Sequence, residues 1–168
     1  MAKDLKVLMG AAFILFVLVA GLSQYSMQDG KPALDERANE GAGIEQALLA
    51  ENILVREVIV ADSGDVEEAF GITLNGGKAA VILFESRYEG IRAGAAAEYV
   101  KAITKAFESG GDIAYALALA TNIIGGVSKK PVLVWADRAL AEEIMGKEPL
   151  SAYNHLNLKN LEIDEFVA

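Results

Sequence analysis

Acidic residues end three of the strands that this sequence predicts. Asp62, Glu85 and Asp137 each lie where a run of mainly apolar residues stops. Parallel strands place their carboxyl ends at one edge of a sheet, and such sheets bind their ligands at that edge. The three carboxylates are therefore candidates for one shared site, and their oxygens are ligands that Mg²⁺ and Ca²⁺ accept.

A plainer interpretation of these carboxylates needs no metal. Asp65 and Asp137 precede predicted helices, where an aspartate satisfies the free backbone amides of the first turn. Asp65 with Glu68 also has the spacing of a capping box. Asp62 and Glu85 are then solvated strand ends. We favour this interpretation and assign no metal to the chain.

A different kind of site is indicated by the segment after the second predicted strand. This segment opens a predicted helix, and the free amides at a helix N-terminus can hold a phosphate or a carboxylate. Arg87 and Arg92 would add charge-assisted contacts to such an anion. The glycine spacing, however, is that of neither a dinucleotide-binding loop nor a P-loop. The full set of candidate ligand-binding residues is Asp62, Ser63, Asp65, Glu85, Arg87, Tyr88, Arg92 and Asp137.

The composition excludes several other chemistries. The chain has no cysteine, which rules out disulfides, thiolate nucleophiles and iron–sulfur ligation. Its single histidine, His155, has no serine partner in a recognised catalytic motif. The net charge of -9 argues against nucleic acid as a partner, because that binding relies on clustered Lys and Arg. Catalytic residues and cofactors therefore stay unassigned.

The elements that must hold these residues alternate along the chain. Short, mainly apolar runs predict strands, and apolar residues at intervals of three or four predict helices. The predicted strands are 55–61, 79–85 and 132–136, with an edge strand within 156–167, and the predicted helices are 44–52, 66–72, 91–109, 113–124 and 137–145. This alternation indicates a small three-layer α/β domain with a mostly parallel sheet of about three or four strands.

Two of the predicted helices require a choice between signals. In residues 113–124 large side chains alternate with small ones, which is typical of a strand, but four of the small residues are alanines, which favour a helix. We predict a charge-free helix buried within the domain. In the helix 91–109 we place Tyr99 and Ile103 in the buried stripe and Glu98 on the solvent side.

An apolar run precedes the domain. Val7–Leu22 carries no charge, and the uncharged stretch continues through Gln28. The run alone would be about 24 Å long as a helix, and the continuation brings it to the length that crosses a hydrocarbon core of roughly 30 Å. Lys3 and Lys6 precede the run, whereas the residues that follow it are net acidic. The positive-inside rule then places the N-terminus in the cytoplasm and the domain outside it, anchored to the cell membrane.

A cleaved signal peptide is the alternative interpretation of this run, and it would make the protein secreted. We favour an uncleaved anchor, because the run is long for a signal peptide and its cleavage pattern is poor. The predicted organisation is then an anchor at 1–28, a juxtamembrane linker at 29–43 with one helical turn after Pro32, and an α/β domain at 44–168.

These features predict a single-pass membrane protein whose domain serves in binding or assembly. The lipid bilayer is the expected partner of Val7–Gln28, and other subunits of a membrane complex are the candidate partners of the domain. The first alternative is a membrane-tethered enzyme, either a metal-assisted hydrolase or a phosphoryl-handling protein that uses the acidic strand ends. The second is a structural accessory subunit that contacts a partner through helix 113–124. We favour binding, since the sequence contains no coherent catalytic set.

Overall fold

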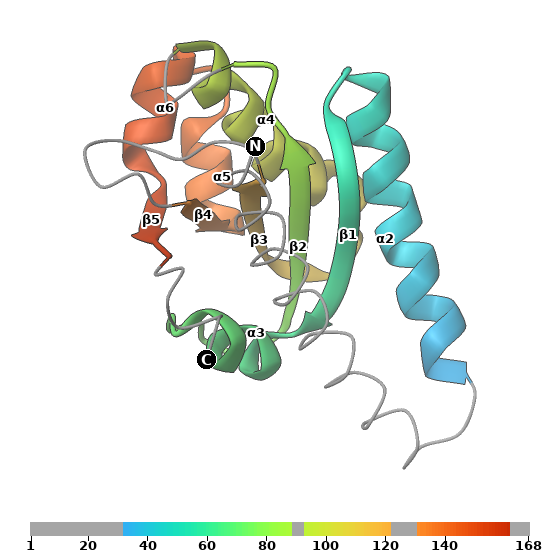
Figure 1. The fold of residues 1–168 in the computed structure, drawn as a ribbon. Coiled ribbons are helices and arrows are strands. Elements are labelled where there is room, and N and C mark those ends of the chain that lie inside the picture. The colour runs from blue at the N-terminus through green and yellow to red at the C-terminus, as the bar shows by residue number, and fades with distance from the viewer. Residues whose placement is uncertain (1–31, 89–92, 122–130, 162–168) are drawn as a thin grey trace, which may run out of the picture.

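The chain folds around one five-stranded sheet (Figure 1). In the computed structural model the described residues are 32–88, 93–121 and 131–161, with side chains described from residue 41 onward. The strands are β1 (Leu54–Asp62), β2 (Lys78–Glu85), β3 (Ile113–Ala120), β4 (Val132–Asp137) and β5 (Asn157–Asn160). The helices are α2 (Pro32–Ala50), α3 (Ser63–Phe70), α4 (Ala93–Ser109), α5 (Arg138–Ile144) and α6 (Pro149–His155). The predicted α/β class is therefore confirmed.

The sheet is mixed, so the prediction of a mostly parallel sheet is wrong. The strand order is β1-β2-β3-β4-β5, and among the described strands β2 and β3 are parallel while the other neighbours are antiparallel. A parallel pair needs a crossover that returns the chain to the starting end of the sheet. The 17-residue α4 provides this crossover between β2 and β3. The 8-residue α3 is about 12 Å long, which is too short to return the chain to the start of β1. β2 therefore starts beside the end of β1 and runs antiparallel to it.

The helix predicted for residues 113–124 is also wrong, because Ile113–Ala120 forms the central strand β3. β3 pairs with β2 on one side and with β4 on the other. Three of its alanines lie on the face that α4 covers, whereas Leu117 and Leu119 lie on the opposite face. Large and small residues thus alternate along β3 because the two faces of the strand pack against different neighbours. Tertiary packing has overridden the helix propensity of alanine here.

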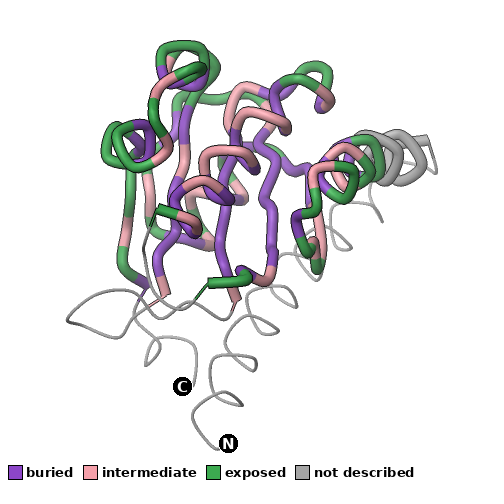
Figure 2. The backbone as a smooth tube through the Cα atoms, turned by 90° about the horizontal axis from the view of Figure 1, so that it is seen from above, coloured by how far each residue is buried: buried purple, intermediate pink, exposed green. Residues whose placement is uncertain are grey.

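Helices α2, α4, α5 and α6 form a layer on one side of the sheet. The core between this layer and the sheet includes Ile44 and Leu48 of α2, Tyr99 and Ile103 of α4, and Ile144 of α5. All five side chains are fully buried. In Figure 2 the buried positions follow the strands, and the exposed positions gather on the outer turns and helix ends. The predicted buried stripe of α4 is therefore confirmed.

Helix α2 belongs to the fold. It begins at Pro32, so most of the predicted linker, residues 29–43, is helical. Proline suits the first turn of a helix, because its fixed φ is helical and its missing amide needs no partner there. At Gly41 a Cβ would stand 3.0 Å from the backbone oxygen of Val58 in β1. The helix therefore packs closely against the edge strand at this point.

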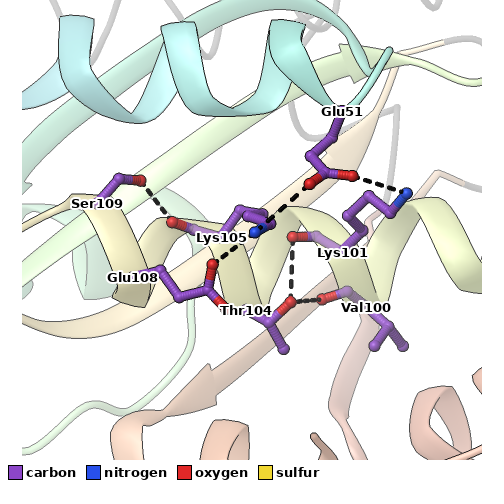
Figure 3. Close-up of polar contacts among 7 residues, drawn as sticks. All are labelled: Glu51, Val100, Lys101, Thr104, Lys105, Glu108 and Ser109. Carbon is purple, nitrogen blue, oxygen red and sulfur yellow. Dashed lines mark hydrogen bonds and ion pairs between the residues drawn. The ribbon is translucent and has the colours of Figure 1, made fainter. Parts of the chain in front are cut away.

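A charged network joins the end of α2 to α4 at the surface (Figure 3). Glu51 pairs with Lys101 at 3.1 Å and with Lys105 at 3.4 Å, and Lys105 also bonds Glu108 at 2.6 Å. The hydrogen bond from Lys101 is the main cause that lowers the pKa of Glu51. The hydrogen bond to Glu108 is the main cause that raises the pKa of Lys105. Exposed ion pairs contribute little to stability, so the apolar side of α2 holds this helix in place.

The opposite face of the sheet is apolar as well. Side chains of β1, β2, β3 and β4 form a second buried cluster there. Among the described helices, α3 joins this cluster, and it lies against β1 and β2. The described residues therefore give a sheet with a full helical layer on one face and α3 on the other.

The predicted membrane anchor, Val7–Gln28, lies outside the described residues. Within the ranges that the structure describes, no helix is long and apolar enough to cross a membrane. The anchor therefore stays a prediction.

Candidate functional site

The sheet separates the three carboxylates that were predicted to share one rim. Asp62 lies opposite Lys78, the first residue of β2, whereas Glu85 is the last residue of β2. These two carboxylates are thus about 20 Å apart along the strand. Asp137 lies at the same end as Asp62, but β2 and β3 stand between them. The shared rim is therefore wrong, because the antiparallel β1 and β4 carry their carboxyl ends away from that of β2.

The acidic residues at the α3 end of the sheet lie at the starts of helices. Asp137 accepts a hydrogen bond at 2.8 Å from a backbone amide in the first turn of α5, so its predicted capping role is confirmed. α3 begins at Ser63, so Asp62 and not Asp65 occupies its N-cap position, and no side-chain cap bond forms there. Ser63 is buried, and its amide donates to the Gly77 oxygen at 2.8 Å. Asp65 lies in the first turn of α3, where negative charge is favoured.

Glu85 connects β2 to the edge strand. Its carboxylate accepts a hydrogen bond from the Arg56 guanidinium, which lies at a register shift between Val55 and Glu57 of β1. The Arg56 side chain is 59% exposed and that of Glu85 is 38% exposed, so water screens the pair and it contributes little to stability. Charges on an edge strand do discourage pairing with a strand of another chain. In the described structure, Glu85 thus pairs with a charged side chain of the edge strand β1.

Arg87 and Tyr88 follow β2, and both are exposed. The Tyr88 ring lies over Gly94 in the first turn of α4, where a Cβ would overlap the ring. Arg92, the other candidate ligand of an anion, lies outside the described residues. The anion site at Arg87 and Arg92 therefore stays a prediction.

Two buried polar side chains meet where β2 ends, and neither belongs to the candidate set from the sequence. Ser86 is 4% exposed, and Glu98 of α4 is 8% exposed. The Ser86 hydroxyl donates to the Glu98 carboxylate at 2.5 Å, and the Arg87 amide donates to it at 3.4 Å. The Ser86 oxygen accepts from the Tyr88 amide at 3.1 Å. One carboxylate on α4 thus fixes the backbone that leaves β2.

Tyr99 bridges two strands at the same end of the sheet. Its hydroxyl accepts from the Ala120 amide at 3.2 Å and donates to the Val132 carbonyl at 3.1 Å. These groups belong to β3 and β4 just beyond their last pair, Leu119–Leu133. Burial is the main cause that raises the pKa of Tyr99 far above its ordinary value. The neutral phenol therefore joins the two strands at the point where their own pairing ends.

The prediction that Glu98 faces solvent is wrong, and the sequence did contain a signal against it. Ala95 and Ala102 lie three residues before and four residues after Glu98, on the same side of the helix, and both are fully buried. An acidic residue between two small apolar ones on a packed helix face indicates a buried carboxylate, which needs hydrogen-bond partners. Ser86 had no such signal, because its role depends on the end of β2 lying beside α4.

The polar groups at this end of the sheet fix backbone positions. Ser86 donates to a carboxylate and accepts from an amide, so its hydroxyl is held in place. The only histidine in the chain, His155, is exposed on α6, with its Nδ1 2.7 Å from the Ser151 oxygen. Within the described ranges, no group of three His, Asp or Glu residues is placed to hold a metal ion. The described polar contacts hold the backbone at the end of β2 and join β3 to β4.

Comparison with known proteins adds no constraint on function. The chain matches no family model, no curated protein and no solved structure. An α/β fold by itself carries many unrelated activities.

Replacing Glu98 with glutamine is expected to lower the free energy of unfolding by about 1–2 kcal/mol. The amide keeps the shape of the side chain but supplies one acceptor oxygen where the carboxylate supplies two, so Ser86 or the Arg87 amide loses its partner. Urea unfolding of the full chain in mild detergent, followed by Trp135 fluorescence, measures the loss. Glu108→Gln is the matched control, since Glu108 is exposed on the same helix. Equal losses in the two variants would contradict the role of Glu98.

Proposed function

We propose that this chain is a single-pass membrane protein whose α/β domain acts in binding or assembly at the membrane surface. The N-terminus lies in the cytoplasm, Val7–Gln28 crosses the bilayer, and the domain lies on the extracytoplasmic side. Its partners are other subunits of a membrane complex. The observation that carries the proposal is the uncharged stretch Val7–Gln28, with Lys3 and Lys6 before it and net acidic residues after it.

The geometry of the domain favours binding over catalysis. A metal-assisted hydrolase that used the strand ends would need Asp62, Glu85 and Asp137 in one site, and the sheet holds Glu85 at the end opposite to Asp62. The buried polar groups, Ser86 and Glu98, bond each other and the backbone of the loop. The backbone at the end of β2 is thus held in place, and the chain is acidic overall, which supports the binding of a protein partner.

Assembly has a direct experimental consequence. Extraction of the full chain from its native membrane in a mild detergent is expected to yield a particle whose protein mass clearly exceeds the 17.8 kDa of one chain. Light scattering with absorbance and refractive index gives the protein mass separately from the detergent, and gel analysis gives the stoichiometry of any second subunit. The control is the same chain produced in a host that lacks its native partners. Recovery of single chains from the native membrane in several mild detergents would contradict an assembly role.

The secreted alternative is tested on the same material. Cleavage of the run as a signal peptide would leave a mature chain that begins after it, whereas an anchor keeps Met1–Leu22 in the protein. Intact-mass measurement of the extracted chain separates the two. The mass of the full sequence supports the anchor.

A further inference from the structure

Hydrogen bonds from two side chains hold the backbone that leaves β2. The Glu98 carboxylate accepts from the Arg87 amide at 3.4 Å and from the Ser86 hydroxyl at 2.5 Å. The Ser86 oxygen accepts in turn from the Tyr88 amide at 3.1 Å. Two consecutive residues, Arg87 and Tyr88, are therefore fixed in backbone position while their side chains are exposed.

The Tyr88 side chain is held as well. Its ring lies against the first turn of α4, where a Cβ on Gly94 would stand 2.4 Å from a ring atom. Glycine at this position therefore leaves the space that the ring occupies. Tyr88 is nonetheless 47% exposed. An exposed tyrosine whose backbone and ring are already held loses little conformational freedom on binding, which lowers the entropic cost of a contact.

Apolar side chains lie at the same end of the sheet. Leu54, the first residue of β1, is 45% exposed and pairs in register with Glu85 of β2. Leu49, near the end of α2, is 50% exposed, and its carbonyl accepts from the Asn52 amide in the turn that leads to β1. The end of α2, the start of β1 and the end of β2 lie together in Figure 1. The exposed residues that form this β2-end surface are Leu49, Leu54, Arg87 and Tyr88.

Arg87 provides an unpaired charge on this surface. The nearby charges are neutralised, since Arg56 pairs with Glu85 and Glu51 pairs with Lys101. The Arg87 guanidinium forms no ion pair with any of the described residues. A guanidinium offers two parallel N–H donors that match a carboxylate. Because the chain has a net charge of -9, its overall field opposes an acidic partner, and a carboxylate is favoured where it meets this guanidinium.

We propose that the β2-end surface is the contact surface for a second membrane subunit, which places a carboxylate on Arg87 and an apolar side chain against Tyr88. This inference rests on the proposed function, because it names the part of the domain that assembles. Tyrosine and arginine are the residue types enriched at the energetic centres of protein interfaces. Leu49 and Leu54 extend the apolar contact area. A lipid surface fits less well, because binding to anionic lipids relies on clusters of basic residues and this surface has one unpaired cation.

Charge reversal and truncation test the two central contacts separately. Arg87→Glu and Tyr88→Ala are made in the full chain, which is produced in its native membrane and extracted in mild detergent. Each variant is expected to reduce the co-extracted second subunit at least about tenfold, as the loss of a central interface residue does. The matched controls are Lys78→Glu, which reverses a charge at the opposite end of β2, and Leu158→Ala, which shortens a similarly exposed side chain on β5. Both controls are expected to keep the full amount.

Arg87→Glu also separates lost binding from lost folding. The described hydrogen bonds at this position come from the backbone amide, so the substitution leaves them in place. Urea unfolding followed by Trp135 fluorescence is expected to give the same midpoint for Arg87→Glu and the unaltered chain. Arg87→Glu alone decides the outcome if Tyr88→Ala does not fold.

A photoreactive residue then locates the partner's side of the contact. The amino acid p-benzoylphenylalanine in place of Tyr88 is irradiated in native membranes, and mass spectrometry identifies the cross-linked peptide. This peptide is expected to come from the second subunit and to contain Asp or Glu beside an apolar residue. Replacing that acidic residue with Arg is expected to restore assembly to Arg87→Glu but not to Tyr88→Ala. A cross-link to lipid in place of protein would overturn the protein partner and assign the surface to the bilayer.

This inference and the proposed function fail in different ways. If the unaltered chain is extracted as single chains, both are wrong. If the extracted particle contains a second subunit, and Arg87→Glu and Tyr88→Ala assemble as fully as the control variants, the β2-end surface is wrong while assembly stands. A cross-linked peptide without a carboxylate, or a charge exchange that does not restore Arg87→Glu, would overturn the contact between Arg87 and an acidic residue.

Discussion

Tyr99→Phe is expected to lower the free energy of unfolding by about 2–3 kcal/mol. The ring contacts with Phe84 and Tyr153, at centroid distances of 5.1 and 5.6 Å, remain in the variant. The loss comes from the hydroxyl, because the Ala120 amide loses its acceptor and the Val132 carbonyl loses a donor in a fully buried place. A buried polar group without a partner costs more than a hydrogen bond contributes.

The same residue makes stability depend on alkaline pH. Burial raises the pKa of Tyr99, and also that of Tyr153, above the ordinary tyrosine value. Above about pH 10 the unfolded chain releases these protons while the folded chain still holds them. The stabilisation is therefore complete below pH 10 and declines as the pH rises. Tyr99→Phe removes one of the two groups, so its unfolding free energy is expected to fall less steeply above pH 10 than that of the unaltered chain.

Urea unfolding of the full chain in mild detergent at neutral pH and at pH 9–11 measures both effects, with Trp135 fluorescence as the signal. Tyr88→Phe is the matched control, since Tyr88 is exposed and its hydroxyl lies outside the bridge between β3 and β4. A loss below about 0.5 kcal/mol is expected for this control. If Tyr99→Phe behaves like Tyr88→Phe, the bridge contributes nothing and our account of this end of the sheet is wrong.

The local sequence pattern was sufficient to predict most of the strands and helices. The apolar runs of β1, β2 and β4 and the spaced apolar residues of α4 occur where they were predicted, and β5 lies within the predicted edge strand. Asp137 was correctly identified as a cap, because a cap depends on neighbours within one helical turn. Asp65 was not, since α3 starts at Ser63, three residues earlier than the predicted helix 66–72. Helix boundaries are less well determined by pattern than the elements themselves.

The local sequence pattern could not predict the features of the fold that depend on residues far apart in the chain. Nothing within Ile113–Ala120 shows that it lies between two strands, so its alanines were assigned to a helix. Strand direction depends on how far each connection carries the chain, and a strand buried on both faces has the same composition in a parallel and in a mixed sheet. The error in direction produced the error at the site, because Asp62, Glu85 and Asp137 share a rim only if all their strands are parallel.

The polar contacts at the end of β2 show the same limit. Glu98 was assigned to solvent from its charge, although its spacing from Ala95 and Ala102 places it on the packed side of α4. Its partner Ser86 is twelve residues away in sequence and is identified only when β2 and α4 lie together. In an isolated helix sequence, the charge of a glutamate predicts that it is exposed. In the folded protein, the packing of that helix face determines whether the side chain is buried.

Leu15→Lys is expected to have the second large effect, on membrane insertion. A lysine at the centre of a spanning helix costs about 2.5–3.5 kcal/mol, which lowers the inserted fraction roughly 100-fold when insertion is near balance. The full chain is therefore expected to move from the pellet to the supernatant after alkaline carbonate extraction of membranes. Ser26→Lys is the matched control. It adds the same charge near the predicted end of the uncharged stretch, where lysine reaches the interface, so this variant stays in the pellet.

Orientation of the inserted chain tests the central claim most directly, and the absence of cysteine provides a clean background. Ala2→Cys marks the N-terminus, and Asn154→Cys marks an exposed position of the domain. Each variant is treated with a membrane-impermeant maleimide in intact cells and again after permeabilisation. Our account predicts that Asn154→Cys is labelled in intact cells and that Ala2→Cys is labelled only after permeabilisation. Labelling of both positions from the same side of the membrane would contradict a single-pass anchor.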